Sequence, residues 1–353
     1  MNYGIICEFN PFHKGHKYLI DTIKSENDSV ICVMSGNLVQ RGEFAIYDKL
    51  TRAKTALENG ADLVIELPCV YSVMSAKGFA QNAVSILEST GCVDALAFGG
   101  ECDDIERLYD IAKRVKNSDA LIKKEMKKGI SYPSARRNIV NSSVLDSPNN
   151  ILAIEYINAT NLDCRVVKRI GAGHDSNDSD YSASAIRKSL SDDDICTLKN
   201  CEKAVLAKLR TMTAEDFLNI EDVSDGLENR LCEAVNTATS LDELYDLVKT
   251  KRYTHSRIRR IILRAYLGIT RDFSFKPPYI RVLGFNSRGR EILAYMKKVA
   301  SLPIISRYAD IKELDDNAKK LFELECRCTD LCALGYKKAL PCGAEQKSQI
   351  IIL

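Results

Sequence analysis

Several features that are common in other classes of protein are missing from this sequence. No apolar run approaches the length needed to span a bilayer, and the N-terminus lacks the charged and then apolar segments of a secretion signal. The 50 Lys and Arg residues nearly balance the 48 Asp and Glu residues, which leaves a net charge of +2. A charge this small does not by itself indicate nucleic-acid binding, so any basic surface must be local. We therefore expect a soluble, cytoplasmic protein with no membrane partner.

Paired Cys-X-X-Cys knuckles, typical of structural zinc sites, are also absent, although the chain has 13 cysteines. This number is odd, and Cys7, Cys32 and Cys164 lie inside apolar, strand-like runs. Free, mostly buried thiols in a reducing compartment explain the distribution best. Four cysteines near the C-terminus also lack the spacing of a zinc site, so we predict no metal ligands among them; they are Cys326, Cys328, Cys332 and Cys342.

The first half of the chain alternates strand-like and helix-like segments. This alternation predicts an α/β fold with a Rossmann-like parallel sheet, covered by helices on both faces and binding its ligand at the carboxyl ends of the strands. The predicted strands are 3–9, 29–34, 63–67, 95–98 and 164–170, and the predicted helices are 16–25, 47–59, 76–90, 103–115 and 149–160. A chain of 353 residues suits two or three domains. We predict an α/β domain over 1–190, a helical, basic region over 191–270 and a small α+β segment over 271–353.

The strongest local pattern lies in the first sixteen residues. An apolar run predicts a buried strand that ends at Asn10-Pro11, because proline removes a backbone donor. A helix is expected to begin near His16, so that His13 and His16 lie where a strand leads into a helix N-terminus. Free N–H groups and the helix dipole favour anions at such a place, and Gly15 lets a ligand approach the backbone closely.

Such a site suits nucleotidyl transfer, in which a nucleophile displaces pyrophosphate from the α-phosphate of a nucleotide. Two imidazoles can donate hydrogen bonds to the oxygens on which negative charge develops. An attacking group that is already an anion needs no general base. The alternative is that His13 and His16 only cap and pack the helix start. The strand, the proline turn, the glycine and the helix together favour the functional interpretation.

The His-Lys-Gly-His element after a first strand resembles the signature of the HIGH-motif nucleotidyltransferase superfamily. Further stretches resemble the bacterial tRNA(Met) cytidine acetate ligase family in particular, densely over about the first half of the chain and more loosely after it. They are 34–43, 60–68, 98–101, 147–152, 169–174 and 182–187. The resemblance implies that the α/β domain is a nucleotidyltransferase domain.

The resemblance also implies ATP as co-substrate, with Mg²⁺ expected, although no cluster of carboxylates in the sequence identifies a magnesium ligand. It implies that His13, His16 and Arg187 are catalytic. Carried over position by position, the expected ATP-binding residues are Cys7, Glu8, Phe9, Asn10, Pro11, Phe12, His13, Gly15, His16, Gly100, Asn150, Arg169, Ser184 and Arg187.

Some of these residues also have a purely structural interpretation. The pair Gly99-Gly100 could lie against a nucleotide, but paired glycines usually mark only a turn. Asn149 and Asn150 lie at a predicted helix start, where at least one of them is expected to cap the helix. Arg169 ends the fifth strand, where it could reach a phosphate or form a surface ion pair.

The segment 182–188 is expected to begin another helix. Ser184 and Arg187, one turn further along, would form a second cradle for anions. The segment resembles the second signature of the superfamily, which implies contact with the β- and γ-phosphates. A plain N-cap with an exposed arginine is the alternative. His174 could cap a helix, bind ribose or lie near the nucleophile.

A basic segment lies in the helical region. Residues 249–264 contain seven Lys or Arg residues and no acid, which in a nearly neutral chain predicts a docking surface for an RNA backbone. Ile258, Ile261 and Ile262 recur between the arginines at helical spacing, so one face belongs to the core. The alternative is an amphipathic helix whose basic face is only solvated. The predicted tRNA-binding residues are Lys251, Arg252, Arg257, Arg259, Arg260 and Arg264.

By this resemblance, the enzyme would activate acetate with ATP as acetyl-adenylate, release pyrophosphate and acetylate N4 of the wobble cytidine of elongator tRNA(Met). The implied partners are ATP, acetate and elongator tRNA(Met), and no DNA. We expect the acetate pocket near residues 35–41. Two alternatives stay open: an adenylyltransferase that passes AMP to a small phosphorylated metabolite, and a non-catalytic RNA-binding protein on the same fold.

Overall fold

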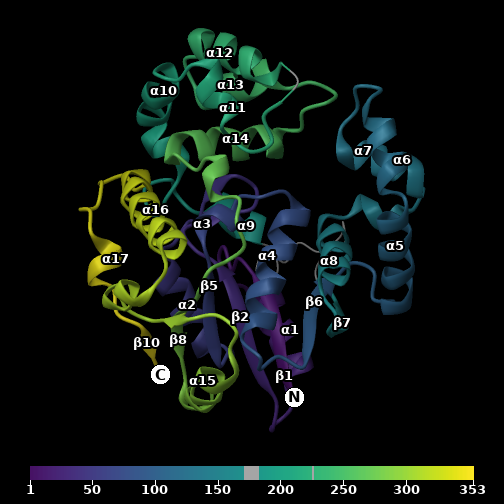
Figure 1. Ribbon diagram of the computed structural model, residues 1–353, viewed down its shortest axis with the longest axis vertical. Coiled ribbons are helices and arrows are strands. Elements are labelled where there is room, and N and C mark those ends of the chain that lie inside the picture. Colours follow the sequence, from purple (N-terminus) through teal and green to yellow (C-terminus); the bar gives the residue numbers. More distant parts are fainter. Residues whose placement is uncertain (171–182, 225) are drawn as a thin grey trace.

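The computed structural model describes residues 1–170, 183–224 and 226–353, and Figure 1 shows their arrangement. Within this described part, a sheet of eight strands has the order β10-β8-β5-β2-β1-β6-β7, with β9 paired to β8. The strands from the first half of the chain are parallel, and they confirm the five predicted strands: β1 (Asn2–Cys7), β2 (Ser29–Ser35), β5 (Leu63–Leu67), β6 (Ala95–Gly100) and β7 (Asp163–Lys168).

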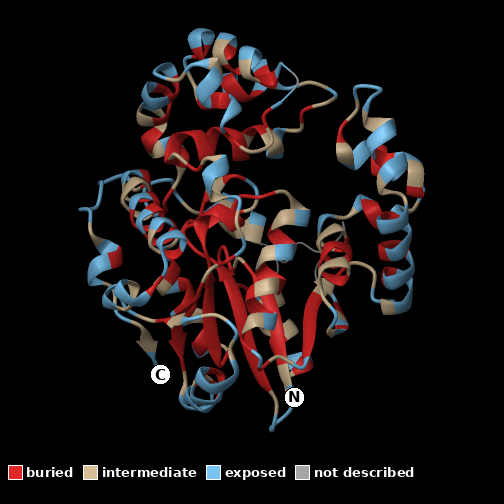
Figure 2. Cartoon of the chain, in the orientation of Figure 1, coloured by how far each residue is buried: buried red, intermediate tan, exposed pale blue. Residues whose placement is uncertain are grey.

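The central strands are buried on both faces, which explains their nearly continuous apolar sequences. Every residue of β2 is buried (Figure 2). Because side chains alternate along a strand, Val30 and Cys32 belong to the apolar cluster on one face, whereas Ile31 and Val33 belong to the cluster on the other.

Helices cover both faces, and the five predicted helices are confirmed. One face carries α1 (Lys14–Ile23) and α2 (Lys49–Glu58). The other carries α3 (Cys69–Ser72), α4 (Ala76–Ser89), α5 (Ile105–Asn117) and α8 (Pro148–Ala159). A hairpin of β3 (Leu38–Val39) and β4 (Glu43–Phe44) follows β2, and α9 (Ala183–Ser189) follows β7. Among the described residues, the 3₁₀ helices are Ser143–Asp146, Leu198–Cys201, Arg271–Phe273, Tyr308–Glu313 and Ala333–Gly335.

Two short helices that the sequence analysis missed lie between β6 and β7. They are α6 (Asp119–Met126) and α7 (Tyr132–Val140), which follow α5 and project beside the main body (Figure 1). Buried Arg136 of α7 forms an ion pair with Glu155 of α8, with Nη1 and Oε1 3.0 Å apart. The pair fastens α7 to the helix that covers the sheet.

The helical region lies beyond the carboxyl ends of the strands (Figure 1). It comprises α10 (Glu202–Arg210), α11 (Ala214–Leu218), α12 (Leu227–Thr237), α13 (Leu241–Val248) and α14 (His255–Leu267). The β3–β4 hairpin supports α14 closely: Gly42 has a φ of +80°, and a Cβ atom there would lie 2.5 Å from the backbone nitrogen of Arg260. Beside it, Arg259 Nη1 lies 2.5 Å from Glu43 Oε1. The position of α14 therefore depends on the loop that follows β2.

The C-terminal segment returns to the same sheet. Its β8 (Ile280–Phe285) pairs antiparallel with β5, and β9 (Ile304–Ile305) and β10 (Ile351–Ile352) pair with β8. The helices of this segment are α15 (Ser287–Val299), α16 (Asp316–Cys332) and α17 (Ala344–Lys347). Among the described residues, none of the helices is long and apolar enough to cross a bilayer.

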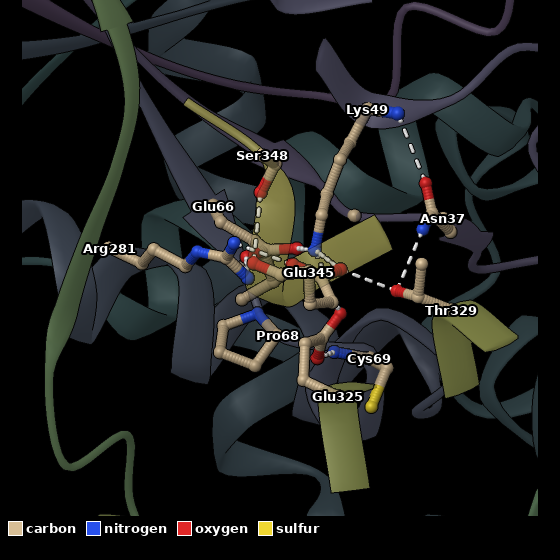
Figure 3. A network of polar contacts seen from close by, with 12 residues as sticks. Asn37, Lys49, Glu66, Pro68, Cys69, Arg281, Glu325, Thr329, Glu345 and Ser348 are labelled. Carbon is tan, nitrogen blue, oxygen red and sulfur yellow. Dashed lines mark hydrogen bonds and ion pairs between the residues drawn. The ribbon is translucent and has the colours of Figure 1, made fainter. Parts of the chain in front are cut away.

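A buried ionic network joins this segment to the first half of the chain (Figure 3). Lys49 Nζ of α2 lies 2.5 Å from Glu66 Oε1, 2.5 Å from Glu345 Oε1 and 3.4 Å from Glu325 Oε1. Arg281 of β8 contacts Glu66 and Glu345, at 2.9 and 2.6 Å. Each cation thus connects carboxylates from elements that are far apart in sequence, which fixes α16 and α17 against the sheet.

Candidate active site

A cavity of about 800 Å³ opens at the carboxyl ends of β1, β6 and β7, where the sequence analysis expects the ligand. The loop after β1, the start of α1, the β3–β4 hairpin, α4, α6, α7, α8, α9 and the start of α14 all contribute to its wall. Eight of the fourteen expected ATP-binding residues line it: Cys7, Glu8, Phe9, Asn10, Gly15, His16, Arg169 and Arg187.

The start of α1 is held by its two histidines. His13 is the N-cap residue, and its Nδ1 accepts a hydrogen bond from the Gly15 N–H at 3.1 Å. In the reverse direction, His16 Nδ1 accepts from the His13 N–H at 3.3 Å. The two rings stack with their centroids 3.7 Å apart. Capping and a role at the cavity are therefore not exclusive alternatives, because His16 makes one of these capping bonds and also lines the cavity.

The surroundings of the two rings determine their charge, and the hydrogen bonds above determine which nitrogen carries the proton. Burial and the charges of Arg169 and Arg187 lower the pKa of His13 to about 4. Burial, His13 and Arg169 lower the pKa of His16 well below its usual value. Both rings are thus neutral near pH 7, and a neutral imidazole that accepts at Nδ1 carries its proton on Nε2. The capping arrangement leaves one Nε2–H donor on each ring, with His16 in the cavity wall.

The loops after β1 and β2 are held together by Arg52, a buried residue that the sequence analysis missed. Its guanidinium donates to the carbonyl oxygens of Glu8 and Gly36, and to that of Ser35 at 3.1 Å. Glu8 Oε1 accepts in turn from the Gln40 N–H at 2.7 Å. Burial raises the pKa of Glu8. Of residues 35–41, where we expect the acetate pocket, Gln40 and Arg41 line the cavity.

Arg187 connects α9 to the loop after β1. Its guanidinium donates to the Asn10 carbonyl oxygen, and Nη2 donates to Ser184 Oγ at 3.2 Å. The Asn10 side chain accepts from the Ile46 N–H at 2.8 Å, so this loop is held from two sides. Arg187 lines the cavity, whereas Ser184 is exposed beside it.

Arg169 enters the cavity wall from the end of β7. Its N–H donates to the Gly100 carbonyl oxygen at 3.0 Å, and its Nε lies 3.8 Å from Glu101 Oε1. Glu101 also accepts from Asn149 Nδ2 at 2.6 Å. Arg169 therefore lines the cavity, where it could reach a phosphate, and it also lies near a carboxylate, as in an ion pair.

The loop after β6 corrects one prediction. Neither Asn149 nor Asn150 caps α8, because the N-cap residue is Ser147, which makes no side-chain capping bond. Asn150 is buried, and its Oδ1 accepts from the N–H groups of Glu101 and Cys102, both at 3.0 Å. These two hydrogen bonds hold the loop that follows the glycine pair.

The other six expected ATP-binding residues are not among those that line the cavity. Gly99 lines the cavity, but a Cβ atom on Gly100 would lie 2.7 Å from the Cys102 carbonyl oxygen, so a compact loop requires glycine there. Phe12 and His13 pack against His16, and Pro11 precedes them in the same turn. His174, together with 171–173 and Ser182, lies outside the described residues.

The basic helix α14 and the residues just before it place their positive side chains in different surroundings. Arg252 and Arg257 are partly exposed and line the cavity, and Lys251 is exposed nearby. Arg260 is 8% exposed and also lines it. Arg264 is 2% exposed, and its Nη2 lies 2.8 Å from Glu221 Oε2.

This placement corrects the prediction for Arg264. Its guanidinium is committed to Glu221 and to the carbonyl oxygens of Val70 and Val73, so it does not face a docking surface. Arg259 is paired with Glu43 and stacked on Tyr245, with its guanidinium carbon 5.3 Å from the ring centroid. Both residues fasten α14 to its neighbours.

The far side of the cavity was missed by the sequence analysis. Lys77 of α4, Lys123 of α6, and Tyr132 and Arg136 of α7 line it. The guanidinium carbon of Arg136 lies 5.5 Å from the centroid of the Tyr132 ring. A signal was present in the sequence, because residues 123–137 contain six Lys or Arg residues and a single acid, Glu125.

Comparisons with known proteins agree with this geometry. The HIGH Nucleotidyl Transferase family model matches residues 1–205 and 191–347. Two relatives named tRNA(Met) cytidine acetate ligase, from Acetivibrio thermocellus and Thermoanaerobacter sp., are 36% and 38% identical. The alignments cover 99% and 97% of this chain, and the same shares of the relatives. The chain belongs to the tRNA(Met) cytidine acetate ligase family.

Solved structures of a family member support this assignment. The Thermotoga maritima protein TmcAL bound with alpha-thio ATP is 30% identical, with a TM-score of 0.89 over 100% of this chain and 99% of that one. The apo form of the same protein gives a TM-score of 0.90 with the same coverage. The α/β nucleotidyltransferase fold expected from the sequence is therefore confirmed, and a family member with this fold binds an ATP analogue.

Proposed function

We propose that this protein is an ATP-dependent ligase that activates acetate as acetyl-adenylate and acetylates N4 of the wobble cytidine of elongator tRNA(Met). Membership of the family supports the overall activity. The structural observation that carries the proposal is the pair of neutral imidazoles at the N-terminus of α1, each with its Nε2–H free of the capping bonds. We also propose a cytoplasmic location, where the tRNA substrate resides.

In the first step, an acetate oxygen attacks the α-phosphorus of ATP, the bond to the bridging oxygen breaks, and pyrophosphate leaves. Acetate is already an anion, so no base is needed. His13 and His16 donate from Nε2 to the oxygens on which charge builds, and the N-terminus of α1 adds the positive end of its helix dipole. Arg169 and Arg187, which also line the cavity, balance the charge of the departing phosphates.

In the second step, the exocyclic amine of cytidine attacks the acetyl carbon, the amine loses a proton and AMP leaves. This amine is a poor nucleophile, because its lone pair is delocalised into the ring, and a mixed anhydride compensates for that weakness. The base must be unpaired to enter the cavity, which an anticodon loop permits. We assign Lys251, Arg252 and Arg257, on the α14 side of the cavity, to the RNA backbone.

Magnesium is expected to accompany the ATP phosphates. The described residues contain no group of three or more His, Cys, Asp or Glu side chains placed to hold a metal ion, so they do not provide a protein cage. Magnesium bound to nucleotides is held largely by phosphate oxygens and water. No step above is assigned to the ion.

Acetate-dependent exchange of pyrophosphate into ATP tests the first step, and acetylation of tRNA(Met) tests the second. His16→Ala should lower both rates by about 100- to 1,000-fold, the usual loss for one such donor. Lys17→Ala is the matched control, since this next residue of α1 has a side chain that is 43% exposed. If the wild-type protein exchanges pyrophosphate with another acceptor and ignores both acetate and tRNA, it is a metabolite adenylyltransferase.

A further inference from the structure

Helices α6 and α7, which lie between β6 and β7 in the sequence, belong to a strongly positive stretch of the chain. We call residues 119–140, which comprise α6, the turn and α7, the α6–α7 arm. Six of the residues 123–137 are Lys or Arg and one is acidic, which gives this short stretch a charge of +5 in a chain whose total is +2. The rest of the chain is therefore slightly acidic, and this positive charge is local.

The lysines of the α6–α7 arm face solvent. Lys123, Lys124, Lys127 and Lys128 are all exposed. Lys123 pairs with Asp119 and Lys128 with Glu125, each at 2.6 Å, in contacts within the arm. Within the described part of the chain, Lys124 and Lys127 have no acidic partner. Exposed helix pairs of this kind contribute little to stability, about 0.3 to 0.5 kcal/mol each, so folding alone does not explain the cluster.

The position of the arm relates this charge to the active site. Asp119, Lys123, Met126 and Tyr132 from the arm line the same cavity as Arg252 and Arg257 from the α14 side. Figure 1 shows the arm and the helical region of α10–α14 as two separate projections beyond the carboxyl ends of the strands. The mouth of the cavity therefore lies between two basic elements.

The arm is also held firmly enough to take part in binding. Arg136, which is 2% exposed, is paired with Glu155 of α8, and a second wall residue, Tyr132, lies against its guanidinium. Residues 143–146 then lead directly into α8. A macromolecule that contacts the arm and α14 together is thereby held in register with the catalytic histidines.

We propose that the α6–α7 arm is a second RNA-binding surface, whose exposed lysines contact backbone phosphates on the side of the target nucleotide opposite α14. The partner class follows from the chemistry: a row of flexible ammonium groups beside an open cavity suits a polyanion that follows the surface, and Lys binds phosphate as a point charge. Two basic elements on either side of the cavity would hold the strand while the base enters. This proposal rests on the function proposed above.

The experiment compares two variants that each lose two exposed positive charges. The test variant is Lys124→Gln/Lys127→Gln in the arm. The matched control is Lys297→Gln/Lys298→Gln in the last turn of α15, where both lysines are also exposed. This turn lies at the opposite end of the sheet, because Val299 contacts Gly91, which precedes β6. The measurements are the Kd for tRNA(Met) over a series of salt concentrations and acetate-dependent pyrophosphate exchange without tRNA.

The test variant should bind tRNA more weakly, and its plot of log Kd against log salt should be shallower by about 1.4 to 1.8, since each lost phosphate contact removes about 0.7 to 0.9. Pyrophosphate exchange should stay at the wild-type rate, and the control should match wild type in every measurement. An unchanged Kd and slope would overturn the proposal, as would an equal loss in the control or a loss of exchange. If the wild-type protein does not bind tRNA at all, the proposed function itself fails.

Discussion

The imidazole rings of His13 and His16 are stacked at an interplanar angle of 21°, and each Nδ1 accepts a backbone N–H from the same helical turn. One arrangement thus satisfies two of the N–H groups that a helix start leaves without partners, and it also orients two Nε2–H donors. The capping atom Nδ1 and the proposed donor Nε2–H thus belong to the same ring. They can be separated by substitutions that keep Nδ1-like acceptors and remove Nε2.

His13→Asn is such a substitution. Asparagine is a preferred N-cap residue and can accept the Gly15 N–H in place of Nδ1, so the melting temperature should change little. The lost Nε2–H donor should lower acetate-dependent pyrophosphate exchange by about 100- to 1,000-fold. Thermal unfolding and the exchange assay check the two parts. His13→Ala, which loses the cap as well, should be less stable than His13→Asn by about 1 kcal/mol, and equal stability of the two variants would contradict the capping role.

The stability of the protein should depend on pH through His13. In the unfolded chain this histidine takes up a proton near its ordinary pKa of 6.5, whereas burial and the nearby Arg169 and Arg187 lower the pKa in the folded protein to about 4. Between these values the unfolded state binds more protons, so the free energy of unfolding falls as the pH falls from 6.5 towards 4. Urea unfolding at pH 7.5 and pH 5 should show a smaller loss for His13→Asn than for wild type.

The packing of Gly42 against α14 predicts a defect in the second step. In Gly42→Ala the Cβ atom would meet the Arg260 backbone, so α14 must shift, and a displacement of about 1 Å can cost about 100-fold in rate. Acetylation of tRNA should therefore fall far more than pyrophosphate exchange. Gly226→Ala is the matched control: Gly226 has a similar φ of +83°, but nothing lies within 4 Å of the added Cβ. If exchange falls as much as acetylation, the hairpin and not α14 has moved.

The sequence predicted the central sheet because burial on both faces leaves long apolar runs, and it predicted the start of α1 because His13, Gly15 and His16 lie in a fixed local spacing. It did not predict that β8 would pair with β5, since that contact joins residues more than 200 positions apart. The arm was missed because α6 and α7 are short, at 8 and 9 residues.

The arginines of α14 show a second limit of sequence reasoning. Charge alone marked Arg257, Arg260 and Arg264 as equivalent, but their environments differ because each reaches a different partner. Arg264 reaches Glu221 and buried carbonyl groups, whereas Arg257 remains beside the cavity. Arg52 gave no signal in the sequence, since its role depends on carbonyl oxygens from loops that come together only in the folded chain.

The buried network around Lys49 gives a prediction on stability (Figure 3). Lys49 is 4% exposed and lies among three carboxylates, so Lys49→Met leaves Glu66, Glu325 and Glu345 with Arg281 as their remaining cation in the network. Removal of one partner from a buried ion pair costs about 3 to 5 kcal/mol, because the charges that remain are not compensated. Urea unfolding of Lys49→Met should show a loss of that size.

Lys54→Met provides the comparison, since Lys54 is on the same helix but forms only an exposed pair with Glu58, at 3.8 Å. Its free energy of unfolding should change by less than about 1 kcal/mol. Burial raises the pKa of Glu66 to about 7, so this carboxylate can take up a proton in mildly acidic solution once the cation is lost. The instability of Lys49→Met should therefore be smaller at pH 5 than at pH 8, and an equal loss at both pH values would show that lost packing and not uncompensated charge is the cause.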